Sequence, residues 1–134
     1  MHLFFSTPVW IDQINNFESI NSELKNYIYQ EQEKNPDGVK KSNFNGWHSE
    51  GFDLKNENLK NFINEISKNI GVAVNDMGWD LEAQLVKITS MWAIINKNKA
   101  FNERHHHGNS ALSAAYYVKA ENNAGNIVFF DPRQ

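Results

Sequence analysis

Apolar residues recur at helical spacing in the first half of the chain. Between Phe17 and about Glu33 they return every three or four positions, which is typical of one face of an amphipathic helix. Asn15 or Asn16 can cap the start of this helix. The breaker sequence Asn-Pro-Asp-Gly over 35–38 is expected to end it.

A second apolar stripe predicts another helix, which ends at Gly71 or continues through Val74. Such stripes are more typical of a core than of cofactor contacts. Residues 39–53, between the two helices, are predicted to form a loop. This loop carries Trp47 and His48, which either cover an edge of the core or take part in binding. The second stripe contains Leu59, Phe62, Ile63, Ile66 and Ile70.

After Gly78 the pattern changes from helical to extended. Short apolar runs separated by turn sequences are typical of strands. Helices followed by strands predict an α+β fold, a single domain over 1–134 with a helical part over about 1–78 and a β part over about 79–134. The predicted strands cover 81–85, 88–95, 111–119 and 126–130, with an edge strand over 3–11 near the start.

Composition excludes several classes of function. The net charge of −3 and the absence of a basic stripe argue against nucleic-acid binding. The chain has no cysteine, which excludes disulfides and thiolate chemistry. No apolar run is long enough to span a bilayer, so no membrane partner is predicted. The first residues do not resemble a signal peptide, and a cytoplasmic location is predicted.

The candidate chemistry lies in Arg-His-His-His-Gly-Asn-Ser over 104–110. In an extended backbone, side chains two positions apart point the same way, so the imidazoles of His105 and His107 would share one side. Such a pair suits Fe(II), Zn(II) or Cu(II). The alternative is a solvated triplet in a surface loop without a ligand.

A third metal ligand does not follow from the pattern. No histidine comes after His107, and the carboxylates of Glu103, Glu121 and Asp131 have no distinctive spacing. A histidine from elsewhere would complete a three-histidine site of the cupin type. No phosphate-binding loop or nucleophile motif is present, and no residue is assigned a catalytic role from the pattern alone.

Several segments resemble the 2-oxoglutarate/Fe(II)-dependent oxygenases of marine bacteria and their phages. The signature of that family is close to H-x-H-P-x-S-x-L-S-G-V-Y-Y-V, followed after a turn by G-x-I-x-F-x-D-P-R. The chain reads HHHGNSALSAAYYV over 105–118 and GNIVFFDPR over 125–133. It departs from the family at Gly108 and at Ala114-Ala115. Residues 7–10, 42–49 and 90–96 also resemble elements of that family.

This resemblance implies N-terminal helices packed on a double-stranded β-helix, or jelly roll. It implies Fe(II) and 2-oxoglutarate as cofactors, a small-molecule cosubstrate and a hydroxylase-type oxidation of an unknown substrate. His105 matches the first iron ligand, and His107 stands where the wider superfamily has an acidic ligand. Trp92 and Tyr117 either line the cofactor pocket or pack in the core. Arg133 either contacts an acid group or forms a surface contact.

The distal histidine and the arginine that holds 2-oxoglutarate follow the D-P-R segment in the superfamily, and both are absent from this sequence. We therefore expect a partial jelly roll, truncated before the barrel closes, and no activity from this chain alone. A half-barrel exposes an apolar strand edge, which predicts a homodimer through that edge. The alternative function is a non-catalytic jelly-roll module for metal binding or interaction.

Overall fold

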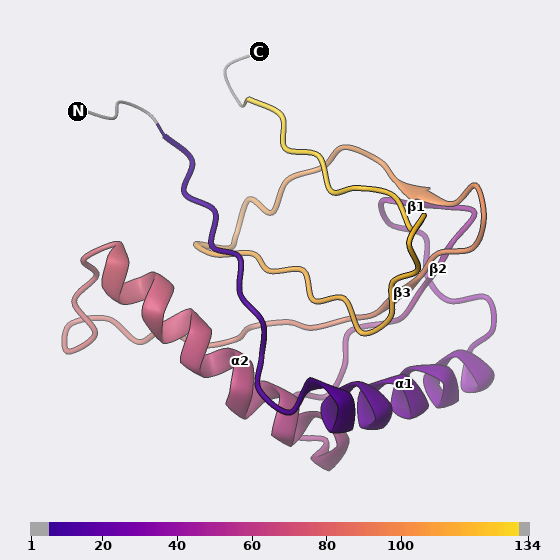
Figure 1. Ribbon diagram of the computed structural model, residues 1–134, viewed down its shortest axis with the longest axis horizontal. Coiled ribbons are helices and arrows are strands. Elements are labelled where there is room, and N and C mark those ends of the chain that lie inside the picture. Colours follow the sequence, from indigo (N-terminus) through magenta and orange to yellow (C-terminus); the bar gives the residue numbers. More distant parts are fainter. Residues whose placement is uncertain (1–5, 132–134) are drawn as a thin grey trace.

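The computed structural model describes residues 6–131 (Figure 1). Helices α1 (Phe17–Lys34) and α2 (Glu57–Asp76) lie along one side of the molecule, and most of the chain after α2 runs along the other side in long extended segments. Residues 3–5 of the predicted first strand, and Arg133, lie outside the described residues.

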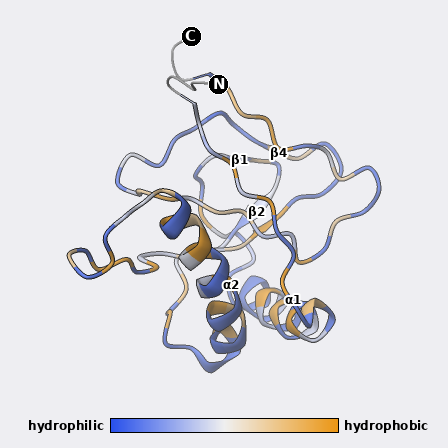
Figure 2. Cartoon of the chain, turned by 60° about the vertical axis from the view of Figure 1, so that its left-hand side comes forward, coloured by the Kyte–Doolittle hydropathy of each residue, from blue (hydrophilic) through white to orange (hydrophobic). Residues whose placement is uncertain are grey.

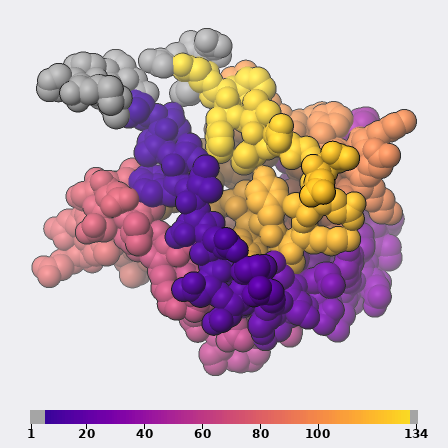
Figure 3. Space-filling model, viewed as in Figure 1, coloured from indigo at the N-terminus to yellow at the C-terminus, as the bar shows by residue number. Residues whose placement is uncertain are grey.

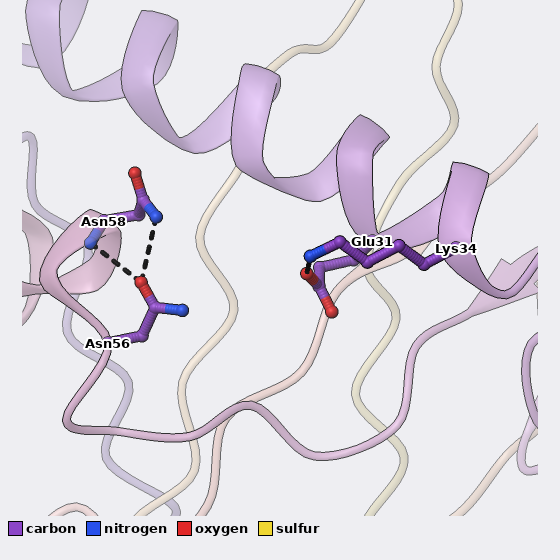
Figure 4. Close-up of polar contacts among 4 residues, drawn as sticks. All are labelled: Glu31, Lys34, Asn56 and Asn58. Carbon is purple, nitrogen blue, oxygen red and sulfur yellow. Dashed lines mark hydrogen bonds and ion pairs between the residues drawn. The ribbon is translucent and has the colours of Figure 1, made fainter.

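Both predicted helices are confirmed, and the second continues past Gly71 to Asp76. Their starts differ. Asn16 precedes α1 with φ of 54° and makes no side-chain cap. The Asn56 side chain instead accepts a hydrogen bond from the Asn58 backbone N–H at 3.0 Å (Figure 4), which satisfies a free donor in the first turn of α2. Neither helix has the length and apolarity needed to cross a membrane.

The core lies where α1 and α2 meet and includes Ile14, just before α1. Both helices are banded in Figure 2, with apolar residues on one face and polar residues on the other. Leu59 is completely buried, and the Asn61 side chain donates to Glu23 Oε2 at 3.0 Å beside this contact. Removal of these apolar faces from water is the main stabilising contribution. The buried core residues are Ile14, Ile20, Leu24, Tyr27, Leu59 and Phe62.

An irregular antiparallel ribbon holds the rest of the chain together. Strand β1 (Asn43–Phe44) pairs with β4 (Phe101–Asn102), and β2 (Trp47–His48) pairs with β3 (Ile94–Ile95). The prediction of a loop over 39–53 is therefore wrong at β1 and β2. A turn over 96–100 joins β3 to β4, as the sequence predicts, and is closed by the Ala100 N–H donating to the Lys97 carbonyl at 2.9 Å.

Backbone hydrogen bonds extend this ribbon beyond the strands. The Phe52 N–H donates to the Met91 carbonyl at 2.8 Å, and the Ser49 N–H donates to the Ala93 carbonyl at 2.9 Å. The Ala93 N–H in turn donates to Ser49 Oγ, not to a backbone carbonyl. The Ser49 hydroxyl thus takes the place of a backbone carbonyl in the hydrogen-bond ladder between β2 and β3. The regular pairing ends after β2 for this reason.

The predicted strands of the β part are largely wrong. Within the described residues, no strand forms over 6–11, 81–85, 111–119 or 126–130, and only β3 forms within 88–95. Over 81–83 the Asp80 carboxylate accepts the backbone N–H groups of Glu82 and Ala83, which favours a turn. The α+β class holds, but the described residues form no closed barrel, and a jelly roll is not confirmed.

Two contacts fasten the segments around Trp10 and Tyr116 to the helices. The Tyr116 ring lies 4.8 Å from the Phe62 ring, and its hydroxyl donates to Asn21 Oδ1 at 2.7 Å. The Trp10 indole N–H donates to Asp76 Oδ2 at 3.0 Å. In the space-filling view the N-terminal segment passes between α2 and the C-terminal segment (Figure 3). These contacts keep the extended segments against the helical layer.

Candidate metal site

His105 and His107 come shortly after β4, beyond Glu103 and Arg104, and their rings contact each other. Their centroids are 5.0 Å apart and the ring planes meet at 78°. Both side chains are exposed, so a metal ion from solvent has access to them. The short spacing along the chain brings the two rings together, and the ribbon that ends at β4 fixes where they lie.

One hydrogen bond sets the tautomer of His105. Its Nδ1 lies 2.8 Å from the backbone carbonyl oxygen of Glu103. A carbonyl only accepts, so Nδ1 carries the proton in this contact, and the Nε2 of the neutral ring keeps a free lone pair. Metal-binding histidines commonly hold their second nitrogen in this way. The bond therefore prepares His105 to act as an Nε2 ligand.

Trp92 lies against the second histidine. Its ring centroid is 5.6 Å from that of His107, at an interplanar angle of 32°, and 37% of the residue is exposed. The sequence left Trp92 as either a pocket wall or a core residue. In the structure it is an exposed residue, outside the buried core, and its ring contacts one member of the histidine pair.

His48, which the sequence left as either a core-edge or a binding residue and not as a metal ligand, extends this row of rings. The His48 ring stacks on the Trp92 ring, with the centroids 5.8 Å apart and the ring planes at 13°. Only 7% of His48 is exposed, and its Nδ1 donates to the Ser49 carbonyl at 2.6 Å. The pairing of β2 with β3 brings His48 to Trp92, and nothing in the spacing of either residue indicates this contact.

Tyr117 lies apart from this row. It is 60% exposed and has no ring contact among the described residues. Its neighbours Tyr116 and Val118 pack against the helical core, so alternate side chains leave Tyr117 on the opposite side of the backbone. The structure does not bring Tyr117 together with the histidines.

The described residues contain no group of three or more histidine and carboxylate side chains that could hold a metal ion. Of the nearby carboxylates, Glu121 pairs with Lys119 at 3.3 Å on the surface. His105 and His107 therefore supply two donors, and a third is not identified within 6–131. Water or a bidentate cosubstrate is the usual occupant of the remaining positions in an open site.

The C-terminal part of the chain matches a known family. A family model described as "Putative 2OG-Fe(II) oxygenase" matches residues 90–134. This segment includes Trp92, His105, His107 and Tyr117, whereas His48 precedes it. No curated protein and no solved structure matches the chain. The match supports an oxygenase of this type for the part of the chain that carries the histidine pair.

Proposed function

We propose that this chain supplies His105 and His107 as iron ligands of a non-haem Fe(II)- and 2-oxoglutarate-dependent dioxygenase. The observation that carries the proposal is the contact between two exposed imidazoles, one of them with Nδ1 held by a carbonyl. The family match over the same segment supports the choice of iron. Two neutral imidazoles suit Fe(II), although they also suit Zn(II) and Cu(II).

The metal would supply the redox chemistry, and the protein would position the groups around it. Within this chain, His105 presents Nε2 because its Nδ1 is engaged by Glu103. The ring of His107 contacts those of both His105 and Trp92. These two contacts limit the orientations that its imidazole adopts.

The role of 2-oxoglutarate, the hydroxylase-type reaction and the jelly-roll architecture rest on the family match and the sequence resemblance. The comparisons do not favour the alternative of a non-catalytic module. The homodimer and the cytoplasmic location stay predictions. Because the described residues provide two candidate ligands, we expect succinate formation by this chain alone to stay at background.

Titration with Co(II), a paramagnetic substitute for Fe(II), tests the metal site. Binding at His107 is expected to quench the fluorescence of Trp92, which lies 5.6 Å from that ring. His105→Ala and His107→Ala are each expected to weaken Co(II) binding by about tenfold or more, because even outer-shell partners of a metal contribute about 10- to 100-fold. Isothermal titration calorimetry gives the affinity and the fluorescence gives the location.

The chain offers a matched control in His106→Ala, which removes an exposed imidazole between the two candidate ligands. This variant is expected to bind Co(II) like the wild type. Trp92→Phe should keep most of the affinity but lose most of the quenching, since Trp92 is the tryptophan whose ring contacts His107. Equal losses in all three histidine variants would mean that the triplet binds metal without a defined site, and the proposal would be wrong.

The stacking of His48 on Trp92 gives a second prediction. We expect His48→Ala to weaken Co(II) binding by about three- to tenfold, because a loose Trp92 no longer restrains the ring of His107 and ordering a side chain on binding opposes affinity by about 0.5–1.5 kcal/mol. His48→Phe keeps a planar ring against Trp92 and is expected to restore binding.

Calorimetry with Co(II) measures both variants, and circular dichroism checks that they fold. A purely structural role for His48 predicts that His48→Phe fails as badly as His48→Ala, because both lose the hydrogen bond to the Ser49 carbonyl. Normal Co(II) binding in His48→Phe would show that the ring at position 48 positions Trp92, and that the loss in His48→Ala is not a loss of folding.

A further inference from the structure

A cavity lies between the C-terminal end of α1 and the segment that joins β2 to α2. Its volume is about 330 Å³, at the lower end of the range for small-molecule sites. It does not include the histidine pair. The residues that line it are Tyr27, Glu31, Asn35, Trp47, Ser49, Glu50, Gly51, Phe52, Asp53 and Asn56.

Three aromatic rings form part of its wall. Tyr27 and Phe52 make an edge-to-face contact at 5.1 Å. The Trp47 indole is fixed because its Nε1 donates to the Asn35 carbonyl at 2.9 Å. Aromatic faces attract cations through the ring quadrupole, and these three rings are held in place before any ligand arrives.

The hydroxyl of Tyr27 is left without a partner in this wall. Tyr27 is only 6% exposed, and its hydroxyl makes no hydrogen bond to any of the described residues. No completely enclosed side-chain N or O among those residues lacks a partner, so this oxygen retains an opening. Burial, and then the charges of Glu31 and Asp53, raise the pKa of Tyr27, while Lys34 lowers it. Tyr27, Glu31 and Asp53 all line this cavity.

The cavity is negatively charged. It is lined by the carboxylates of Glu31, Glu50 and Asp53. Lys34 neutralises Glu31 through an ion pair of 2.6 Å (Figure 4). Asp53 accepts a hydrogen bond from the Lys55 backbone N–H, and the Glu50 carboxylate has no partner among the described residues. This charge disfavours a dianion such as 2-oxoglutarate and favours a cation.

Strand β2 separates this cavity from the candidate metal site. Trp47 and Ser49 line the cavity, whereas His48, between them, stacks on Trp92. Successive residues of a strand face opposite sides. The two sites therefore share one strand and use opposite faces of it, so a ligand in the cavity does not contact the histidine pair.

We propose that the cavity lined by Tyr27, Trp47 and Glu50 is a binding site for an organic cation, an ammonium group on an apolar stem. The aromatic rings contact the apolar stem and the ammonium group. Glu50, Asp53 and the free hydroxyl of Tyr27 accept hydrogen bonds from its N–H groups. Both a free amine and the side chain of a lysine in another protein carry this chemistry. The site is independent of the proposed iron chemistry.

Titration with n-butylammonium, followed by amide chemical shifts and by tryptophan fluorescence, tests this site. We expect binding with a dissociation constant of about 1 mM and shifts confined to the cavity residues. n-Butanol and potassium chloride at equal concentration supply the stem alone and the charge alone, and neither should reproduce the shifts. A short acetylated peptide with one central lysine distinguishes a protein side chain from a free amine as the ligand. Tighter binding of the peptide than of n-butylammonium would assign a lysine side chain, and weaker binding would assign a free amine.

Glu50→Gln is the main variant, because Glu50 is exposed and its change does not threaten folding. It is expected to weaken n-butylammonium binding by about threefold, and Glu50→Gln with Asp53→Asn by more. Glu33→Gln removes the same charge from an exposed position near the end of α1, outside the cavity lining, and should leave binding unchanged. Equal binding of n-butanol, or equal effects of Glu33→Gln and Glu50→Gln, would overturn the proposal. Co(II) binding at the histidine pair should not change in any of these variants.

Discussion

Phe62→Ala is expected to lower the free energy of unfolding by about 3–5 kcal/mol, the usual range for truncating a buried phenylalanine. Phe62 belongs to the core between the helices and is also the ring on which Tyr116 packs at 4.8 Å. The change therefore leaves a cavity in the core and removes the anchor of the C-terminal segment. Urea denaturation measures the loss.

Val72→Ala provides the control within the same helix. Val72 lies in α2 and is 57% exposed, so its truncation should change stability by no more than about 0.5 kcal/mol. Amide chemical shifts around Tyr116 should move in Phe62→Ala and stay constant in Val72→Ala. If both variants unfold at the same urea concentration, the helices do not form the main core.

The two helices were predictable because their signal is local. The extent of the apolar stripe in the sequence predicts the length of α1. Ile20 and Leu24 of that stripe are buried as expected. The capping prediction was only half right, since Asn16 occupies the cap position but bonds nothing through its side chain. A left-handed backbone at that residue turns its side chain away from the free N–H groups, and hydropathy carries no information on this angle.

The strands were predicted poorly because a strand needs a partner as well as a pattern. Tyr116 and Val118 face the core and Tyr117 faces away, so part of the strand predicted over 111–119 has the alternating sides of an extended backbone. No ladder forms there among the described residues. Over 127–130 all four apolar side chains are more than half exposed. The sequence indicates which residues prefer an extended backbone, but not which segment pairs with them.

In the candidate site, too, the contact between sequence neighbours was predictable and the contact that depends on strand pairing was not. His105 and His107 are close in sequence, and their contact follows from spacing alone. The contact of His48 with Trp92 depends on the β2–β3 pairing, which the prediction of a loop over 39–53 missed. The hydrophobic pattern does not indicate this pairing, because β2 has only two residues and both are buried.

Gly38→Ala is expected to lower the free energy of unfolding by about 2–4 kcal/mol, the sum of a left-handed backbone and overpacking. Gly38 has φ of +60°, and an added Cβ would lie 2.5 Å from the His48 carbonyl oxygen and 2.8 Å from Trp47 Cδ1 and Nε1. The same carbonyl accepts the Val39 N–H at 2.8 Å. The methyl group therefore pushes on β2, from which both proposed sites are built.

Because β2 carries Trp47 on one face and His48 on the other, Gly38→Ala should weaken n-butylammonium and Co(II) binding together, whereas Glu50→Gln and His107→Ala should each affect one ligand. Gly71→Ala is the matched control. Gly71 lies inside α2 with nothing within 4 Å of an added Cβ, so its change should stabilise the protein by about 0.5–1 kcal/mol. A Gly38→Ala variant as stable as the wild type, with both ligands bound normally, would show that β2 does not hold the two sites in place.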